Sequence, residues 1–93
     1  MKLKPPKEGP TTIVVDYHGL GMALLPGERY LATDADGSVY AYRREPRPHT
    51  DYWVPQNHGG PLSRLVTMVD LEGQDWITTL AEYDEEGVEQ PPL

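Results

Sequence analysis

The residues best suited to bind a metal ion are a short acidic turn and three histidines. Asp34, Asp36 and Gly37 look like the start of a calcium loop, which needs oxygen ligands at positions 1, 3 and 5, glycine at 6 and glutamate at 12. Counted from Asp34, position 6 is Val39, so the glycine comes two places early. The histidines stand in separate segments without metal-ligand spacing (His18, His49, His58). We therefore predict no metal site.

The chain also offers no recognisable catalytic group. It contains no cysteine, which excludes a thiolate nucleophile. Ser38 and Ser63 lie in no sequence typical of a nucleophile elbow. Gly19 and Gly21 lack the third glycine of a dinucleotide-binding loop. We therefore predict a protein that is not an enzyme and binds no cofactor.

Charge is distributed unevenly along the 93 residues, whose formal net charge is -7. Residues 1–50 carry seven basic and six acidic side chains, whereas residues 51–93 carry one basic and nine acidic ones. Eight carboxylates follow one another without an intervening cation: Asp70, Glu72, Asp75, Glu82, Asp84, Glu85, Glu86 and Glu89. Such a stretch either keeps a small protein in solution or presents a negative field to a basic partner surface.

Two groups of side chains are candidates for binding a partner. The first combines the carboxylates from Asp70 to Glu86 with Tyr52 and Trp53, because large aromatic side chains are frequent anchors of interfaces. The same aromatics are also candidate core residues in a chain without phenylalanine. The second group is an alternative ligand site for a nucleotide and consists of Arg43, Arg44 and Arg47. The arginines would bind the phosphates, and the same two aromatics would stack on the base. Because affinity for nucleic acid comes mainly from Lys and Arg, the acidic balance argues against direct DNA or RNA binding.

The elements that position these side chains are mostly predicted strands. Residues 29–33 and 38–43 are rich in Tyr, Val and Thr and flank an Asp-Gly pair, which is typical of a β-hairpin. The second strand of this hairpin places apolar groups on both faces (Val39 and Ala41; Tyr40 and Tyr42). Further β-rich runs are residues 11–15, 22–25, 51–54 and 65–69.

The last element has helical spacing. Asp75 is a suitable N-cap, and Trp76, Leu80 and Tyr83 fall at i, i+4 and i+7. We therefore predict an α+β fold, in which a small twisted antiparallel sheet of three to five strands carries one C-terminal helix packed on it.

Proline and charge suggest where this fold begins and ends. Residues 1–10 hold three of the ten prolines and predict a flexible extension, and residues 84–93 predict an acidic, Pro-containing flexible tail. Residues 11–83 then form a single α+β domain. A core this small is commonly supplemented by a partner subunit, so a homodimer is one expected state.

The apolar segments are too short to cross a membrane. The longest runs are residues 13–15 and 22–25, far below the length of a spanning helix. The N-terminus has no secretory signal pattern. We therefore expect a cytoplasmic protein that does not bind membranes.

Residues 29–82 resemble small proteins of tailed bacteriophages, most of which have no assigned function. The resemblance lies in the Asp-Ala-Asp-Gly turn at 34–37, the strand Val39-Tyr-Ala-Tyr42, the Tyr52-Trp53 pair and the later Asp75-Trp76. It implies a protein made in the cytoplasm of a bacterial host. Small acidic phage proteins without cysteine often inhibit host proteins, as anti-CRISPR and anti-restriction proteins do.

The resemblance and the charge together favour inhibition of a host protein. The expected target is a nucleic-acid-handling defence complex with a basic surface, approached by charge mimicry. A homo-oligomeric binder, or sponge, for a small molecule or nucleotide signal is the alternative. A structural component of the virion is a third interpretation.

Overall fold

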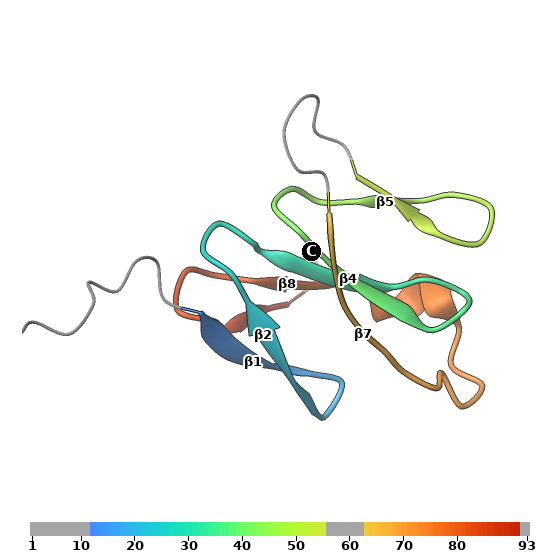
Figure 1. Ribbon diagram of the computed structural model, residues 1–93, viewed down its shortest axis with the longest axis horizontal. Helices are drawn as coiled ribbons and strands as arrows, with labels where there is room; N and C mark the ends of the chain where they lie inside the picture. Colours follow the sequence, from blue (N-terminus) through green and yellow to red (C-terminus); the bar gives the residue numbers. More distant parts are fainter. Residues whose placement is uncertain (1–11, 56–62, 92–93) are drawn as a thin grey trace, which may run out of the picture.

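The computed structural model describes residues 12–55 and 63–91, which form a mostly β structure. Five strands make the central antiparallel sheet, in the order β7-β4-β3-β8-β9, and two hairpins, β1–β2 and β5–β6, form separate two-stranded sheets (Figure 1). The elements are β1 Ile13–Tyr17, β2 Leu20–Leu24, β3 Tyr30–Thr33, β4 Ser38–Tyr42, β5 Arg47–Pro48, β6 Trp53–Val54, β7 Arg64–Met68, the 3-10 helix η1 Trp76–Thr79, β8 Ala81–Tyr83 and β9 Glu89–Gln90.

The hairpin predicted around Asp36-Gly37 is confirmed as β3 and β4. Tyr30 pairs with Tyr42 and Thr33 with Val39. Gly37 adopts a φ of 93°, a conformation that costs glycine little. Asp36 accepts a hydrogen bond from the Ser38 N–H at 2.9 Å, so the acidic residue helps to close the turn.

The β1–β2 hairpin covers one face of the central sheet. Its inward side chains and the facing residues of β3, β4 and β8 form one buried cluster. The hairpin contributes Val15, Tyr17, Met22 and Leu24, and the sheet contributes Leu31, Val39, Ala41, Ala81 and Tyr83. A two-residue turn at His18 and Gly19, both with positive φ, matches the twist of the two strands. The predicted apolar face with Val39 and Ala41 is therefore the main core.

The opposite face of the sheet is covered by aromatic residues of β6 and η1. Ala32, Tyr42 and Trp53 are buried there, with Tyr40 and Trp76 packed against them. The Trp53 indole donates to the Thr33 carbonyl at 3.0 Å and meets the Trp76 ring edge-on at 5.8 Å. Both faces of the hairpin are thus covered, as its sequence predicts.

The α+β prediction is wrong, because the described residues contain no α-helix. Asp75 does cap η1 through the Ile77 N–H, but helical backbone stops at Thr79 and Leu80 is extended, with ψ at 129°. The chain then enters β8, which pairs with β3. Burial alternates at Thr79, Ala81 and Tyr83, so a period of two prevails over the helical spacing.

The predicted tails have different outcomes. Residues 1–10 lie outside the described residues. Within 84–91, assigned to a flexible tail, the structure has a turn and the edge strand β9, which pairs with β8. Gly87 in that turn approaches the side chains of Ile13 and Val15, which brings the turn against β1.

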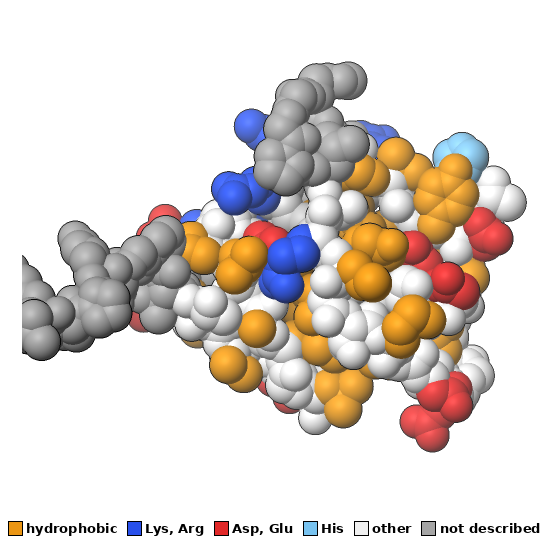
Figure 2. Space-filling view, in the orientation of Figure 1, with side chains coloured by type: hydrophobic (Ala, Val, Ile, Leu, Met, Phe, Trp, Pro, Cys, Tyr) orange, Lys and Arg blue, Asp and Glu red, His pale blue; other side chains and the backbone are white. Residues whose placement is uncertain are grey.

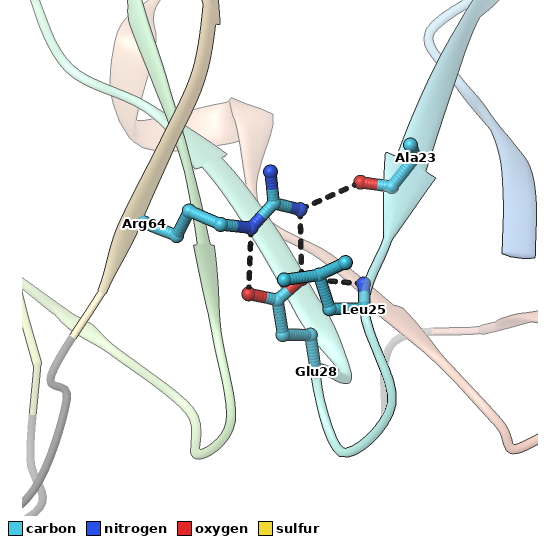
Figure 3. A network of polar contacts seen from close by, with 4 residues as sticks. All are labelled: Ala23, Leu25, Glu28 and Arg64. Carbon is cyan, nitrogen blue, oxygen red and sulfur yellow. Dashed lines mark hydrogen bonds and ion pairs between the residues drawn. The ribbon is translucent and has the colours of Figure 1, made fainter. Parts of the chain in front are cut away.

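An ion pair between half-buried Arg64 and buried Glu28 joins the start of β7 to the β2–β3 connection (Figure 3). Glu28 is only 7% exposed and accepts from Arg64 Nε at 3.0 Å, from Arg64 Nη2 at 2.8 Å and from the Leu25 N–H at 2.7 Å. Arg64 Nη2 also donates to the Ala23 carbonyl at 2.9 Å. These contacts satisfy the carboxylate that burial would otherwise penalise.

Candidate partner-binding surface

Three loops meet at one end of the molecule and bring their acidic residues together. They are the β3–β4 turn, the β5–β6 turn and the loop between β7 and η1, all at the right of Figure 1. The Ala35 N–H donates to the Asp51 carbonyl at 2.9 Å, and the Val69 N–H donates to the Gly37 carbonyl at 2.8 Å. Backbone hydrogen bonds therefore hold the three loops side by side.

We call this surface the acidic end and define it by six carboxylates: Asp34, Asp36, Asp51, Asp70, Glu72 and Asp75. All are exposed except Asp34, which is half-buried. The five described arginines belong to other parts of the fold, namely the β2–β3 connection, the β4–β5 connection, β5 and the start of β7. Figure 2 shows acidic side chains gathered toward the right and basic side chains toward the top and centre of this face. The acidic end therefore presents a negative potential that no arginine of the described ranges offsets nearby.

The titration of two turn carboxylates reflects this arrangement. Burial raises the pKa of Asp34, and the charges of Asp36 and Asp51 raise it further, although the Trp53 N–H donates to its carboxylate at 2.8 Å. In contrast, the hydrogen bond from the Ser38 N–H lowers the pKa of Asp36. Repulsion among these carboxylates is thus part of the folded state, and a cationic partner would relieve it.

The acidic stretch predicted from Asp70 to Glu89 is divided between two ends of the molecule. Asp70, Glu72 and Asp75 belong to the acidic end. The remaining members lie on β8, β9 and the turn between them, at the left of Figure 1: Glu82, Asp84, Glu85, Glu86 and Glu89. The stretch is therefore contiguous in sequence but does not form one surface.

Carboxylates of the β8–β9 turn are partly used within the fold. Asp84 accepts from the N–H groups of Glu86 and Val88, both at 2.9 Å, and the Val88 bond is the main reason that its pKa is lowered. Glu85 lies 3.8 Å from an Arg29 nitrogen. Because Arg29 partly offsets its charge, this turn is a weaker candidate for binding a basic partner than the acidic end.

Sequence reasoning missed three members of the acidic end. The sequence pattern assigns Asp34 and Asp36 only to a hairpin turn or a calcium-type loop, and Asp51 only to the β-rich run 51–54. Loops that follow every second strand of an antiparallel sheet emerge at the same end of the sheet. The sequence could reveal this clustering only if the order of neighbouring strands were known.

The two predicted aromatic anchors have different environments. Tyr52 is 44% exposed and lies beside the His49 ring, with centroids 5.2 Å apart. Trp53 is 5% exposed and belongs to the core. Of this pair, only Tyr52 is available to a partner, and it stands next to Asp51 of the acidic end.

The arginines of the alternative ligand site lie on one connection and on the short strand that follows it. Arg43, Arg44 and Arg47 are exposed on the β4–β5 connection and β5. Arg43 packs over the β2–β3 connection, close to Gly27. The hollow between Arg47 and Trp53, about 420 Å³ in volume, also contains the carboxylate residue Glu45. Trp53 is mostly buried, whereas Tyr52, the other aromatic of this prediction, is exposed.

The histidines and the possibility of a spanning helix can be checked over the part of the chain that the structure describes. His18 Nε2 donates to the Thr79 carbonyl oxygen at 3.0 Å, and His58 lies outside the described part. Over residues 12–55 and 63–91, no three His, Asp or Glu side chains are arranged to hold a metal ion. In the same ranges, no helix has the length and apolar character needed to cross a bilayer.

Comparison with protein-family models, with curated protein sequences and with solved structures finds no match to this chain. The resemblance to small phage proteins therefore stays a prediction.

Proposed function

We propose that this protein is a non-enzymatic binding protein whose acidic end docks on a basic surface of a partner protein. The observation that carries the proposal is the convergence of three loops, which places six carboxylates at one end with no described arginine among them. Complementary charge accelerates encounter and selects against other acidic partners.

The surface also offers apolar contacts for the centre of an interface. Tyr52 and Ile77 are 44% and 50% exposed and flank the loops of the acidic end. An aromatic anchor surrounded by charged groups is a common arrangement at interfaces. The proposed partner therefore combines Lys and Arg side chains with an apolar depression.

A nucleic-acid-handling protein of a bacterial host fits this chemistry, because its binding groove is basic. Occupation of such a groove by the acidic end inhibits the host protein by excluding its nucleic acid. This role agrees with the phage resemblance and places the protein in the bacterial cytoplasm. The nucleotide-sponge alternative is less favoured, since one of its two aromatics, Trp53, is buried and Glu45 lies near its arginines.

The test is capture of a partner from nuclease-treated bacterial lysate by the tagged full chain, followed by binding measurements on the purified pair. The variant Asp51→Asn/Asp70→Asn/Glu72→Gln is expected to bind about tenfold or more weakly. Raising salt from about 50 to about 300 mM is expected to slow association of the wild type strongly. The purified partner should lose its nuclease or nucleic-acid-binding activity when the wild-type protein is added.

The matched control is Glu85→Gln/Glu86→Gln/Glu89→Gln, which removes the same charge from the β8–β9 region. It is expected to bind as the wild type does. Equal loss in both variants would show a general charge effect, and unchanged binding by the first variant would refute the role of the acidic end.

A further inference from the structure

The two edges of the central sheet differ in how well they are protected. β9 has two residues and is followed by Pro91 and Pro92, features that prevent further strand pairing. β7 is the opposite edge strand, has five residues and contains no proline or lysine (Figure 1). Leu65 and Met68 on this strand are 52% and 58% exposed. β7 is therefore an edge with the length and composition to pair with another strand.

Some backbone N–H and C=O groups of β7 point away from its partner strand β4. The Val69 N–H bonds to the Gly37 carbonyl, and Met68 pairs with Ser38. Because bonded and non-bonded pairs alternate in an antiparallel ladder, the N–H and C=O of Met68 point outward. A register shift between Val39 and Tyr40 leaves Leu65 paired with Tyr40. This pair is also non-bonded, so the N–H and C=O of Leu65 point outward as well.

A hollow lies beside this edge. It measures about 440 Å³ and is lined by residues 20–23 of β2 and residues 66–69 of and after β7. The segments 20–25 and 65–69 contain no charged residue, although the chain has a net charge of -7. Two copies of an acidic protein meet with the least repulsion at such a neutral surface.

We propose that β7 pairs antiparallel with β7 of a second copy, so that the sheet becomes continuous across a twofold axis. With the axis between Val66 and Thr67, Leu65 of one copy lies opposite Met68 of the other, and their exposed side chains meet.

Charge selects this antiparallel orientation and a second copy as the occupant. Asp70 and Glu72 follow the end of β7, whereas Arg64 at its start is paired with Glu28. Antiparallel pairing keeps the carboxylates of the two copies at opposite ends of the contact, and parallel pairing would bring them together. An isologous contact of this kind closes as a dimer rather than growing into a fibre.

The test is the mass of the full chain in solution, measured by light scattering after size exclusion over a range of concentrations. The wild type is expected at twice the monomer mass of 10.5 kDa. The variant Leu65→Lys/Met68→Lys is expected at the monomer mass, since charges on an edge strand oppose pairing. The control Val14→Lys/Val88→Lys changes the charge equally at residues that are 73% and 58% exposed, and it should remain dimeric.

Cross-linking provides a second measurement that does not depend on the lysine variant folding. Because the chain has no cysteine, the variant Leu65→Cys/Met68→Cys is expected to form a covalent dimer under mild oxidation, and Val14→Cys/Val88→Cys is not. A wild type that stays monomeric, a wild type that forms larger assemblies, or equal cross-linking in both cysteine variants would each overturn the proposal.

Discussion

Asp34 illustrates how the tertiary structure changes the behaviour of a turn residue. Its carboxylate accepts a hydrogen bond from the Trp53 N–H, yet burial and the neighbouring Asp36 and Asp51 raise its pKa above the usual 3.8. The folded chain therefore binds this proton more tightly than the unfolded chain. Ionised Asp34 consequently lowers stability once the pH exceeds its folded pKa, and it has no such effect below the unfolded pKa.

Neutralisation of Asp34 is expected to stabilise the protein near pH 7. In Asp34→Asn the side-chain oxygen still accepts from Trp53, while the unfavourable charge is gone. The gain over wild type should disappear as the pH falls below about 3.8, where the unfolded wild-type residue is also neutral. Urea unfolding at several pH values measures this difference.

Asp36→Asn is the control, and the opposite sign is expected. The hydrogen bond from Ser38 lowers the pKa of Asp36 in the folded state, so its ionised form contributes stability above the unfolded pKa. That contribution is lost as the pH falls through the lowered folded pKa. A change of the same sign in both variants would contradict the assignment.

Among the elements, the β3–β4 turn links the core to the acidic end. Gly37 has a φ of 93°, and a Cβ atom at this position would overlap the Val69 carbonyl oxygen. The close approach of Gly37 to Val69 is what places the loop carrying Asp70 and Glu72 beside the turn. This glycine therefore positions the acidic surface as well as closing the hairpin.

Gly37→Ala is expected to destabilise the protein more than Gly73→Ala. Both glycines have positive φ, which costs an alanine roughly 1–2 kcal/mol. A Cβ at Gly73 meets none of the described residues within 4 Å, so this variant bears the backbone cost alone. Thermal unfolding should separate the two, and equal losses would show that contact with Val69 is unimportant.

The C-terminal elements show where sequence patterns are ambiguous. Residues 76–83 satisfy both a helical spacing at Trp76, Leu80 and Tyr83 and an alternation at Thr79, Ala81 and Tyr83. The alternation prevails because β3 has an unpaired edge that β8 completes. The Thr79 hydroxyl also accepts from the Thr33 N–H at 2.9 Å, which ends the helical turn against the sheet. A local pattern of eight residues contains neither fact.

At the scale of the whole molecule, charge is concentrated more than its sequence suggests. The acidic end gathers carboxylates from three loops, and the net charge of -7 has no local compensation there among the described residues. Like charges held together in the folded state lower its stability, and dissolved salt screens them.

The melting temperature at neutral pH is therefore expected to rise with salt. The variant Asp51→Asn/Asp70→Asn/Glu72→Gln should melt higher than wild type at low salt and should respond less to added salt. Neutralisation of Glu85, Glu86 and Glu89 is expected to have less effect, because Glu85 has Arg29 nearby. Calorimetry at about 20 and about 300 mM salt checks this, and a wild type insensitive to salt would contradict it.

The sequence alone determined the β-hairpin at Asp36-Gly37, the two apolar faces of its second strand and the N-cap at Asp75. These features depend on contacts between residues close in the chain, where backbone preference and side-chain alternation suffice. The acidic character of the protein was likewise visible in its composition.

Only the tertiary structure decided which charges share a surface and which aromatic is exposed. Asp34, Asp51 and Asp70 come together because β7 lies beside β4 and the β5–β6 turn bonds to Ala35. Trp53 is buried because the Thr33 carbonyl and Trp76 surround its indole. Such neighbours are far apart in sequence, and their pairing follows from how the whole chain buries its apolar faces rather than from any local preference.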